Sequence, residues 1–318
     1  MTLRVLDPGL CTLVVDLGRP HHRSLGVPVG GAADRTSLRL GNALVGSPDD
    51  AAALEVNLAG PTLEATVDLA CVVYGAPCQL LVADREVSVG HTFTMHAGER
   101  LQIGSTTEGM RAYLCVRGGL QTPMILGSRS SLAPLRAGVE LPCLPGIIRS
   151  RFVHHLFEWE RERRAYQGWV GTRRRLRVVD GPQASWFSAE RAFLESDAVV
   201  PPPGFTVTSQ SDRMGVRLQG ASVAFPEREL VSEPACPGSV QVTRDGQCIL
   251  LGVDGQTIGG YPKIAQIISA DLDLLGQLRP GDHVFFVRVS LEDAEAINCA
   301  KQAEVNEWLT RLRVSLDA

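Results

Sequence analysis

Short apolar and alternating runs dominate the first half of the chain and predict β-strands rather than helices. They are rich in β-branched and aromatic residues, and Gly, Pro, Asp and Asn separate them. The runs cover residues 12–15, 53–58, 69–74, 79–83, 100–103 and 111–116. One helix interrupts this pattern. Asp34 is a good N-cap, an apolar stripe follows, and Gly46 with Pro48 ends the helix.

The second half repeats the pattern and ends in a helix. Residues 240–243 and 248–253 predict a hairpin around Asp245-Gly246. We expect a further strand at 264–269, a short helix at 270–278 and a strand at 283–289. From Ser290, with Asp293 three residues later, the chain predicts a capped helix. Its expected apolar face, which would dock on the core or meet a partner, consists of Ile297, Ala300, Val305, Trp308 and Leu312.

The length of 318 residues predicts two domains, each able to bury a core of its own. A Gly-acid turn before an alternating strand occurs at 98–103 and again at 281–286, which weakly suggests two related halves. Between the halves, arginine and glutamate crowd a short stretch that indicates a solvated linker. The expected boundaries are 1–145 for the first domain, 146–176 for the linker, 177–290 for the second domain and 291–318 for the C-terminal helix.

The net charge of −4 and pI near 6.0 argue against nucleic acid as a partner. No apolar run is long enough to cross a membrane, and the N-terminus lacks the layout of a signal peptide. None of the eight cysteines forms a C-x-x-C pair, and several lie in apolar runs. We therefore expect reduced, buried cysteines and a cytoplasmic protein.

Several common catalytic motifs are absent. The sequence has no phosphate-binding G-x-x-x-x-G-K-[ST] loop, no dinucleotide G-x-G-x-x-G and no G-x-S-x-G. The adjacent pairs His21-His22 and His154-His155 would not converge on one ion, so no metal site is expected.

Two polar, glycine-rich segments carry the best candidate chemistry. They are the segments Ser211-Asp212-Arg213-Met214-Gly215 and Gly259-Gly260-Tyr261-Pro262-Lys263. Lys263 is one of only two lysines, since Lys301 is the other. A compact ammonium beside a rigid Tyr-Pro pair suits a point charge aimed at an oxyanion. The alternative is a tight turn with a solvated lysine.

These segments, together with others, resemble a known family. The N-terminal part of the resemblance is carried by 9–10, 12–14, 16–19, 26–28, 31–32, Asp34, 42–46, 52–55 and 60–61. The later part is carried by Gly181-Pro182-Gln183, 211–215, 232–233, 237–238, 241–242, 245–246 and 259–263. The chain resembles the family of the 5-oxoprolinase C component (PxpC), also called KipA or allophanate hydrolase subunit 2. That family is similar to subdomains A and B of biotin-dependent carboxyltransferases.

The resemblance implies a mainly β protein with two cyclophilin-like β-barrel domains, a few short helices and a C-terminal helix. The domain 1–145 would be like subdomain A, and 177–290 like subdomain B. Val15, Ala33 and Val216 depart from the family's usual residues, which affects the expected substrate more than the expected fold.

The resemblance also implies an activity that needs partner proteins. The chain would act with a KipI/PxpB-like protein and a PxpA-like protein to open 5-oxoproline to glutamate with ATP. The ATP would be bound by the complex, since this chain has no phosphate loop. The alternatives are a carboxyltransferase half of a biotin-dependent urea carboxylase, or a KipA-like antagonist of a kinase inhibitor. Neither lysine lies in a Met-Lys-Met setting, so biotin would be attached to another chain.

Both enzymatic activities develop negative charge on a carbonyl-type oxygen and therefore need fixed donors. We expect Lys263, Arg213 and the backbone amides of Gly259 and Gly260 to supply them. Asp212 or Glu233 would act as a base or position a substrate nitrogen, unless Glu233 is a surface carboxylate at a strand end. The further residues expected to bind substrate are Tyr261, Gln241, Gln256, Gly31, Asp34 and Glu55. For Asp34, helix capping alone is a sufficient explanation.

Overall fold

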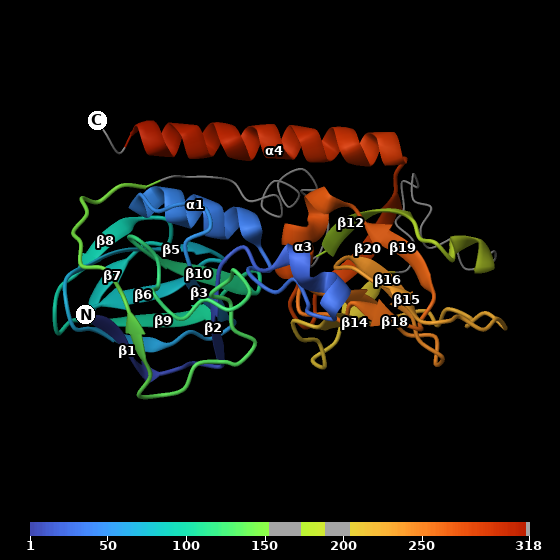
Figure 1. Ribbon diagram of the computed structural model, residues 1–318, viewed down its shortest axis with the longest axis horizontal. Helices are drawn as coiled ribbons and strands as arrows, with labels where there is room; N and C mark the ends of the chain where they lie inside the picture. The colour runs from blue at the N-terminus through green and yellow to red at the C-terminus, as the bar shows by residue number, and fades with distance from the viewer. Residues whose placement is uncertain (153–172, 188–203, 316–318) are drawn as a thin grey trace. The chain divides into compact units, whose positions relative to one another are not determined.

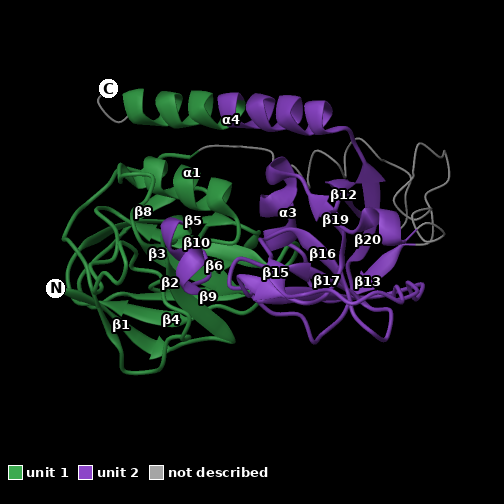
Figure 2. Cartoon of the chain, turned by 45° about the vertical axis from the view of Figure 1, so that its right-hand side comes forward, with its two compact units in different colours: residues 1–20, 30–155, 304–318 green, residues 21–29, 156–303 purple. Residues whose placement is uncertain are grey.

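The chain folds into two compact units, each described here by itself. The structure is a computed structural model, and it describes residues 1–152, 173–187 and 204–315. Unit 1 contains residues 1–20, 30–155 and 304–318, and unit 2 contains 21–29 and 156–303 (Figure 2). Most of the expected charged linker at 146–176 lies outside the described residues.

Unit 1 consists of two antiparallel sheets packed on one core. The six-stranded sheet has the order β11 (Glu140–Pro142), β1 (Thr2–Asp7), β4 (Thr62–Ala65), β9 (Arg100–Thr106), β6 (Cys78–Val82) and β7 (Arg85–Val87). The five-stranded sheet has the order β2 (Cys11–Val15), β3 (Ala53–Asn57), β10 (Arg111–Val116), β5 (Leu69–Gly75) and β8 (Thr92–Met95). All six strands that the pattern predicts here are confirmed.

The core of unit 1 follows from side-chain alternation along these strands. Leu3 and Val5 of β1 and Leu54 and Val56 of β3 point into the same apolar cluster between the sheets. By contrast, β5 is buried along its whole length, because α1 (Arg35–Val45) packs against its other face and against β10 (Figure 1).

Both ends of α1 are as the sequence predicts. Asp34 is the N-cap, and its carboxylate accepts hydrogen bonds from the backbone N–H of Ser37 at 2.9 Å and from Ser37 Oγ at 2.6 Å. Gly46 ends the helix in the left-handed conformation, with φ of 76°. The glycine tolerates this conformation because it has no Cβ.

Replacing Asp34 with alanine is expected to lower the free energy of unfolding of unit 1 by about 1–2 kcal/mol, because the cap is lost in a buried setting. Asp34→Asn should retain most of that stability, since asparagine also caps helices. Urea denaturation of the three proteins measures this. Equal stability of Asp34→Ala and the wild type would contradict the capping role.

Unit 2 is built on a closed barrel of seven strands (Figure 1). The barrel has the order β12 (Arg173–Asp180), β19 (Lys263–Ile267), β16 (Ser239–Val242), β17 (Cys248–Leu251), β14 (Gly215–Gln219), β13 (Phe205–Val207) and β20 (His283–Arg288). β12 and β20 run parallel and close the barrel, and the other neighbours are antiparallel. A separate two-stranded ribbon pairs β15 (Glu233–Pro234) with β18 (Ile258–Gly259).

The predicted hairpin around Asp245-Gly246 is confirmed, because β16 and β17 pair across it and Gly246 has φ of 78°. The short helix is also present, as the 3-10 turn η4 (Ser269–Asp271) followed by α3 (Leu272–Gly276). Two further 3-10 turns are η1 (Pro20–Leu25) and η2 (Ala184–Trp186).

The C-terminal helix α4 (Leu291–Val314) begins with the expected capping interaction. Ser290 Oγ accepts from the backbone N–H of Asp293 at 3.0 Å and donates to its carboxylate at 2.6 Å. Val305 and Leu312 are buried as predicted, but Ala300 is exposed. The predicted apolar face is wrong at Ala300, because the buried stripe through Ala294, Val305, Leu309 and Leu312 passes through Lys301 at this turn, where the lysine side chain is 16% exposed and lies 2.8 Å from Asp273.

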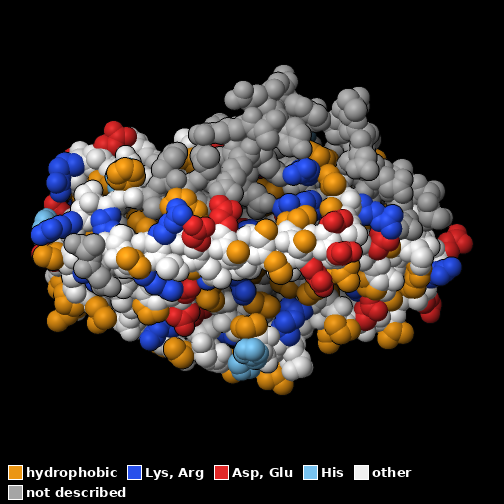
Figure 3. All heavy atoms as spheres, turned by 90° about the horizontal axis from the view of Figure 1, so that it is seen from above, with side chains coloured by type: hydrophobic (Ala, Val, Ile, Leu, Met, Phe, Trp, Pro, Cys, Tyr) orange, Lys and Arg blue, Asp and Glu red, His pale blue; other side chains and the backbone are white. Residues whose placement is uncertain are grey.

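The fold class is confirmed: the protein is mainly β, with a closed barrel, few helices and a C-terminal helix. Within the described ranges, no helix is long and apolar enough to cross a membrane. On the face that carries α4, basic and acidic side chains are interspersed (Figure 3).

The eight cysteines are all free, but they are not all buried. Burial raises the pKa of Cys143 to about 11 and that of Cys248 to about 12, so both thiols stay protonated. The expectation of buried cysteines is wrong for Cys236 and Cys299, which are exposed.

Candidate functional site

A buried polar cluster lies on the outer side of the barrel of unit 2. Val240 and Val242 of β16 point into the barrel core, so Gln241 between them points to the outside. Lys263 of β19 stands opposite Gln241 in the strand register and directly precedes the core residue Ile264. The alternation of these two strands therefore places a glutamine and a lysine side by side outside the barrel.

Lys263 is not a solvated lysine. Its side chain is 5% exposed, and Nζ lies 2.5 Å from Oε1 of Glu233, which stands on β15 of the ribbon. Nζ has no other polar partner in the described part of the chain. A buried ammonium with N–H bonds left over is costly unless something else accepts them.

Gln183 fixes both members of this ion pair. Its Nε2 donates to Glu233 Oε1 at 2.8 Å, and its Oε1 accepts from the backbone N–H of Lys263 at 3.0 Å. Its own backbone N–H donates to the carbonyl of Lys263 at 3.2 Å. The pKa of Glu233 is lowered, first by the neighbouring Lys263 and then by the hydrogen bond from Gln183. Glu233 is thus held as a carboxylate beside a fixed cation.

Gly259 packs closely against side chains beside this cluster. A Cβ atom at this position would lie 2.4 Å from Gln256 Nε2 and 3.3 Å from Gln241 Nε2. Gln256, Gly259, Gly260 and Tyr261 all line an open groove of about 690 Å³. Its other wall is formed by residues of the preceding loop and hairpin, namely Phe225, Arg228, Glu229, Leu230, Val231, Ser232 and Arg244. The buried cluster therefore adjoins a groove large enough for a small molecule.

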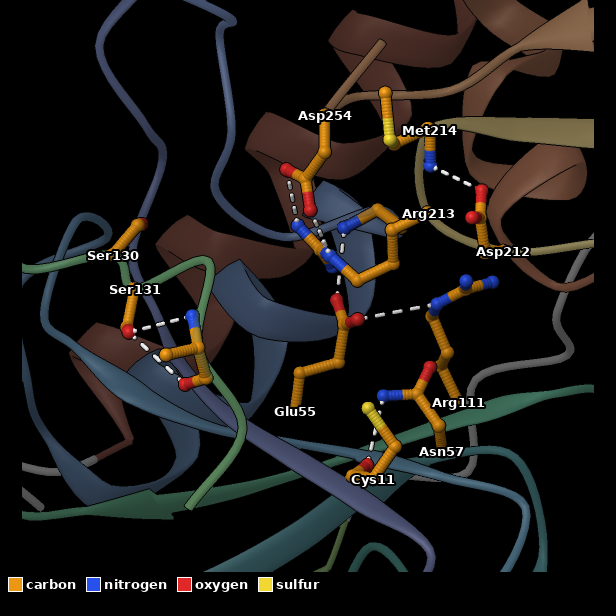
Figure 4. A network of polar contacts seen from close by, with 12 residues as sticks. Cys11, Glu55, Asn57, Arg111, Ser130, Ser131, Asp212, Arg213, Met214 and Asp254 are labelled. Carbon is orange, nitrogen blue, oxygen red and sulfur yellow. Dashed lines mark hydrogen bonds and ion pairs between the residues drawn. The ribbon is translucent and has the colours of Figure 1, made fainter.

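The other expected catalytic residues of unit 2 make different contacts. Arg213 forms a two-point ion pair with Asp254, at 2.6 and 3.0 Å (Figure 4). The carboxylate of Asp212 accepts from the backbone N–H groups of Met214 at 2.8 Å and Gly215 at 3.0 Å. This is the geometry of a side-chain-stabilised turn, which accounts for Asp212 structurally.

In unit 1, Glu55 is fully buried and accepts hydrogen bonds from three sides. Arg111 Nε donates to Oε1 at 3.1 Å (Figure 4). Tyr113 Oη and the backbone N–H of Ala33 donate to Oε2 at 2.9 and 3.0 Å. Burial, followed by the charge of Glu55, raises the pKa of Tyr113 well above its usual range.

Gly31 and Asp34 precede α1 in the same unit. A Cβ on Gly31 would lie 2.5 Å from the backbone nitrogen of Gly18, so a glycine is required there by packing. Among the residues that the structure describes, the group around Lys263 joins a charged pair to a groove.

Gln183 is the residue that the sequence reasoning left out of the site. It belongs to the segment Gly181-Pro182-Gln183, which carried part of the family resemblance, and that was the one available signal. Its role depends on contacts with residues 50 and 80 positions away, which spacing does not reveal.

The described residues contain no group of three or more His, Cys, Asp or Glu side chains arranged to hold a metal ion. What the site offers is a fixed cation with unpaired N–H bonds, a neighbouring carboxylate and an open groove. Such a set can stabilise a developing oxyanion and accept a proton.

Comparison with known proteins agrees with the sequence resemblance. The chain is 37% identical over 305 residues to the 5-oxoprolinase C component of Escherichia coli, covering 92% of this chain and 93% of the relative. It is 34% identical over 319 residues to the 5-oxoprolinase C component of Haemophilus influenzae, covering 98% of each chain.

Solved structures extend the comparison. The urea amidolyase of K. lactis has a TM-score of 0.82 and 27% identity, covering 96% of this chain. The protein TTHA0988 has a TM-score of 0.76 and 34% identity, covering 90% of this chain. This chain spans 20% of the urea amidolyase chain and 55% of TTHA0988. Residues 25–288 match the family described as carboxyltransferase domain, subdomain A and B, and this chain belongs to that family.

Proposed function

We propose that this chain is the C component of an ATP-dependent 5-oxoprolinase, active with a KipI/PxpB-like protein and a PxpA-like protein in the cytoplasm. The observation that carries the proposal is the buried Lys263, paired with the partly exposed Glu233 beside the groove. Two relatives that match nearly the whole chain bear the name of this 5-oxoprolinase component, which supports this choice of reaction.

In this proposal, the chain activates the lactam carbonyl of 5-oxo-L-proline. ATP is a substrate of the assembled complex, and it phosphorylates the carbonyl oxygen before water attacks the carbonyl carbon. The ring C–N bond then breaks and the nitrogen gains a proton, which gives the γ-acyl phosphate of glutamate. A second water molecule displaces phosphate from this acyl group and gives glutamate, with the ADP of the first step as the other product. Lys263 Nζ stabilises the negative charge on the oxygen, and Glu233 accepts a proton from the attacking water.

The remaining candidates have supporting parts in this proposal. Tyr261, Gly260 and Gln256 line the groove and would contact the substrate. Arg213 holds Asp254, and Asp212 stabilises the turn beside it. Asp34 and Glu55 support the fold of unit 1.

The test is reconstitution of the wild-type chain with its PxpA-like and PxpB-like partners, followed by measurement of glutamate release. The proposal expects release that requires both ATP and 5-oxoproline. Folded, assembled proteins that release no glutamate would contradict it.

The structural likeness to urea amidolyase favours a second candidate, the carboxyltransferase half of a biotin-dependent urea carboxylase. Carboxyl transfer also develops charge on a carbonyl oxygen, so the same lysine would serve. The carboxybiotin would have to come from another chain, since Lys263 follows Pro262 and Lys301 follows Ala300. Transfer from carboxybiotin to urea, without glutamate release, would select this candidate.

Replacing Gln183 with leucine is expected to move the acid limb of the pH profile of kcat/KM to higher pH. Glu233 is active as a carboxylate, and its lowered pKa keeps it ionised at low pH. Without the hydrogen bond from Gln183, that pKa rises, so activity is lost at a higher pH as the solution is acidified. The measurement is glutamate release against pH in the assembled complex.

The control for this variant is Gln266→Leu, which makes the same change on β19 away from Glu233. Its acid limb should stay where the wild type has it. If Gln183→Leu also left the acid limb in place, Glu233 would not be the proton acceptor.

A further inference from the structure

The side-chain amide of Gln241 is an unpaired polar group inside unit 2. The residue is 2% exposed, and its Nε2 is buried with no hydrogen-bond partner among the described residues. Buried amides in proteins are nearly always paired, because water must be given up to bury them. A buried donor without an acceptor therefore points to a ligand that supplies one.

A second donor with unpaired N–H bonds, Lys263 Nζ, lies beside the Gln241 amide. Lys263 is directly opposite Gln241 in the register of β16 and β19, and within the described ranges its Nζ has no partner other than Glu233. Because the ribbon supplies just one carboxylate oxygen at 2.5 Å, the ammonium has N–H bonds to spare.

Gly259 lies beside both the groove and the Gln241 amide. A Cβ there would be 3.3 Å from Gln241 Nε2, and Gly259 itself lines the groove. A Cβ there would also lie 2.4 Å from Gln256 Nε2, so the side chain of Gln256, which lines the groove too, covers this approach. A ligand reaches the amide when that flexible side chain moves aside.

We propose that Gln241 Nε2 and Lys263 Nζ form a two-donor subsite for the carbonyl oxygen of an amide substrate. Both groups only donate here, so the ligand atom must be an acceptor. Lys263 and Glu233 already form a neutral pair, and the nearby carboxylate repels a second anion. A neutral amide oxygen therefore fits better than a carboxylate. This inference rests on the proposed function, because it names the substrate group that Lys263 meets.

The test uses Gln241→Met with 2-pyrrolidinone, an uncharged lactam, as the probe, and acetate as the carboxylate comparator. Methionine fills a similar volume without a polar end. We expect Gln241→Met to bind 2-pyrrolidinone roughly tenfold more weakly, as measured by calorimetric titration. Its Tm should equal or exceed that of the wild type, since no hydrogen bond from the amide nitrogen to the described residues is lost.

Gln266→Met is the matched control, because Gln266 lies on the neighbouring strand β19 with its amide fully engaged. Its Nε2 donates to the carbonyls of Pro237 at 2.9 Å and Ile267 at 3.2 Å, and its Oε1 accepts from Ser239 Oγ at 2.9 Å. This variant should lower Tm and leave binding of 2-pyrrolidinone unchanged. Gly259→Ala is a second test, since its methyl group would lie 2.4 Å from Gln256 Nε2 and 3.3 Å from Gln241 Nε2, which crowds the approach to the subsite and should weaken binding.

Three results would overturn the inference. They are a Gln241→Met protein with lower Tm and unchanged binding, a wild type that does not bind 2-pyrrolidinone, and acetate binding that is tighter and depends on Gln241. The assay is separate from turnover. Gln241-dependent binding without glutamate release would keep the subsite and reject the proposed reaction. Glutamate release with an unchanged KM in Gln241→Met would keep the proposed reaction and reject the subsite.

Discussion

Lys263→Met is expected to reduce kcat for glutamate release by roughly 10²–10³-fold in the assembled complex, the usual effect of removing one preorganised oxyanion donor. The lysine is held in place before substrate arrives. Its Nζ lies 2.5 Å from Glu233, and its backbone N–H donates to Gln183 Oε1. A donor fixed in a site with little water needs no reorganisation when charge develops, which makes its loss costly.

The control is the other lysine of the chain. Lys301 of α4 lies 2.8 Å from Asp273 and donates to the carbonyl of Ala270 at 2.5 Å. Lys301→Met removes the same charge from the same unit, so it should lower stability slightly and leave kcat unchanged. Circular dichroism and the elution volume of the complex confirm folding and assembly for both variants.

An unchanged kcat in Lys263→Met would remove Lys263 from the reaction. If both variants also retained regulation of a KipI-like partner, the KipA-like interaction role would gain support. Loss of glutamate release in Lys263→Met alone would instead place the reaction beside the groove.

Local patterns in the sequence predicted most of the elements of this fold. The strands follow from short β-branched runs, the ends of α1 from Asp34 and Gly46, and the hairpin from Asp245-Gly246. These signals are local, because a cap or a tight turn depends on a few neighbouring residues. The exposed Ala300 of α4 shows the limit of such local patterns, because the residues that a helix buries depend on the elements that pack against it.

The site was less accessible to sequence reasoning. Lys263 is prominent because lysine is rare, but its partner Glu233 lies 30 positions earlier and on a two-residue strand. In the sequence, Arg213 and Asp212 are equally good candidates for catalytic residues. In the structure, Arg213 pairs with Asp254 and Asp212 stabilises a turn. Residue type identified the candidates, and the strand register of the barrel then placed Gln241 and Lys263 side by side.

Glu55 shows the same distinction in unit 1. As an isolated carboxylate in a strand it suggests substrate binding, but β3 carries it into the interior, where Arg111 of the neighbouring strand β10 lies beside it. The pair is almost inaccessible to water, with side chains 5% and 0% exposed for Arg111 and Glu55. Removing one partner of a buried ion pair strongly destabilises the folded protein, because the other charge is then buried without compensation.

Glu55→Leu is therefore expected to lower the free energy of unfolding of unit 1 by about 3–5 kcal/mol. The substitution leaves the Arg111 guanidinium without this counter-charge, and it also removes the acceptor of Tyr113 Oη and of the backbone N–H of Ala33. Urea denaturation followed by far-UV circular dichroism measures the loss. Adding Arg111→Met to Glu55→Leu should recover a large part of it, since the uncompensated charge is then gone.

Glu64→Leu is the matched control on a partly exposed pair. Glu64 lies 3.2 Å from Arg4, and their side chains are 21% and 43% exposed. Water and salt screen such a pair, so this variant should lose no more than about 1 kcal/mol. If Glu55→Leu lowered the free energy of unfolding as little as Glu64→Leu, the Glu55–Arg111 pair would not be stabilising the two strands. A role in substrate binding would then be the better explanation of the buried carboxylate of Glu55.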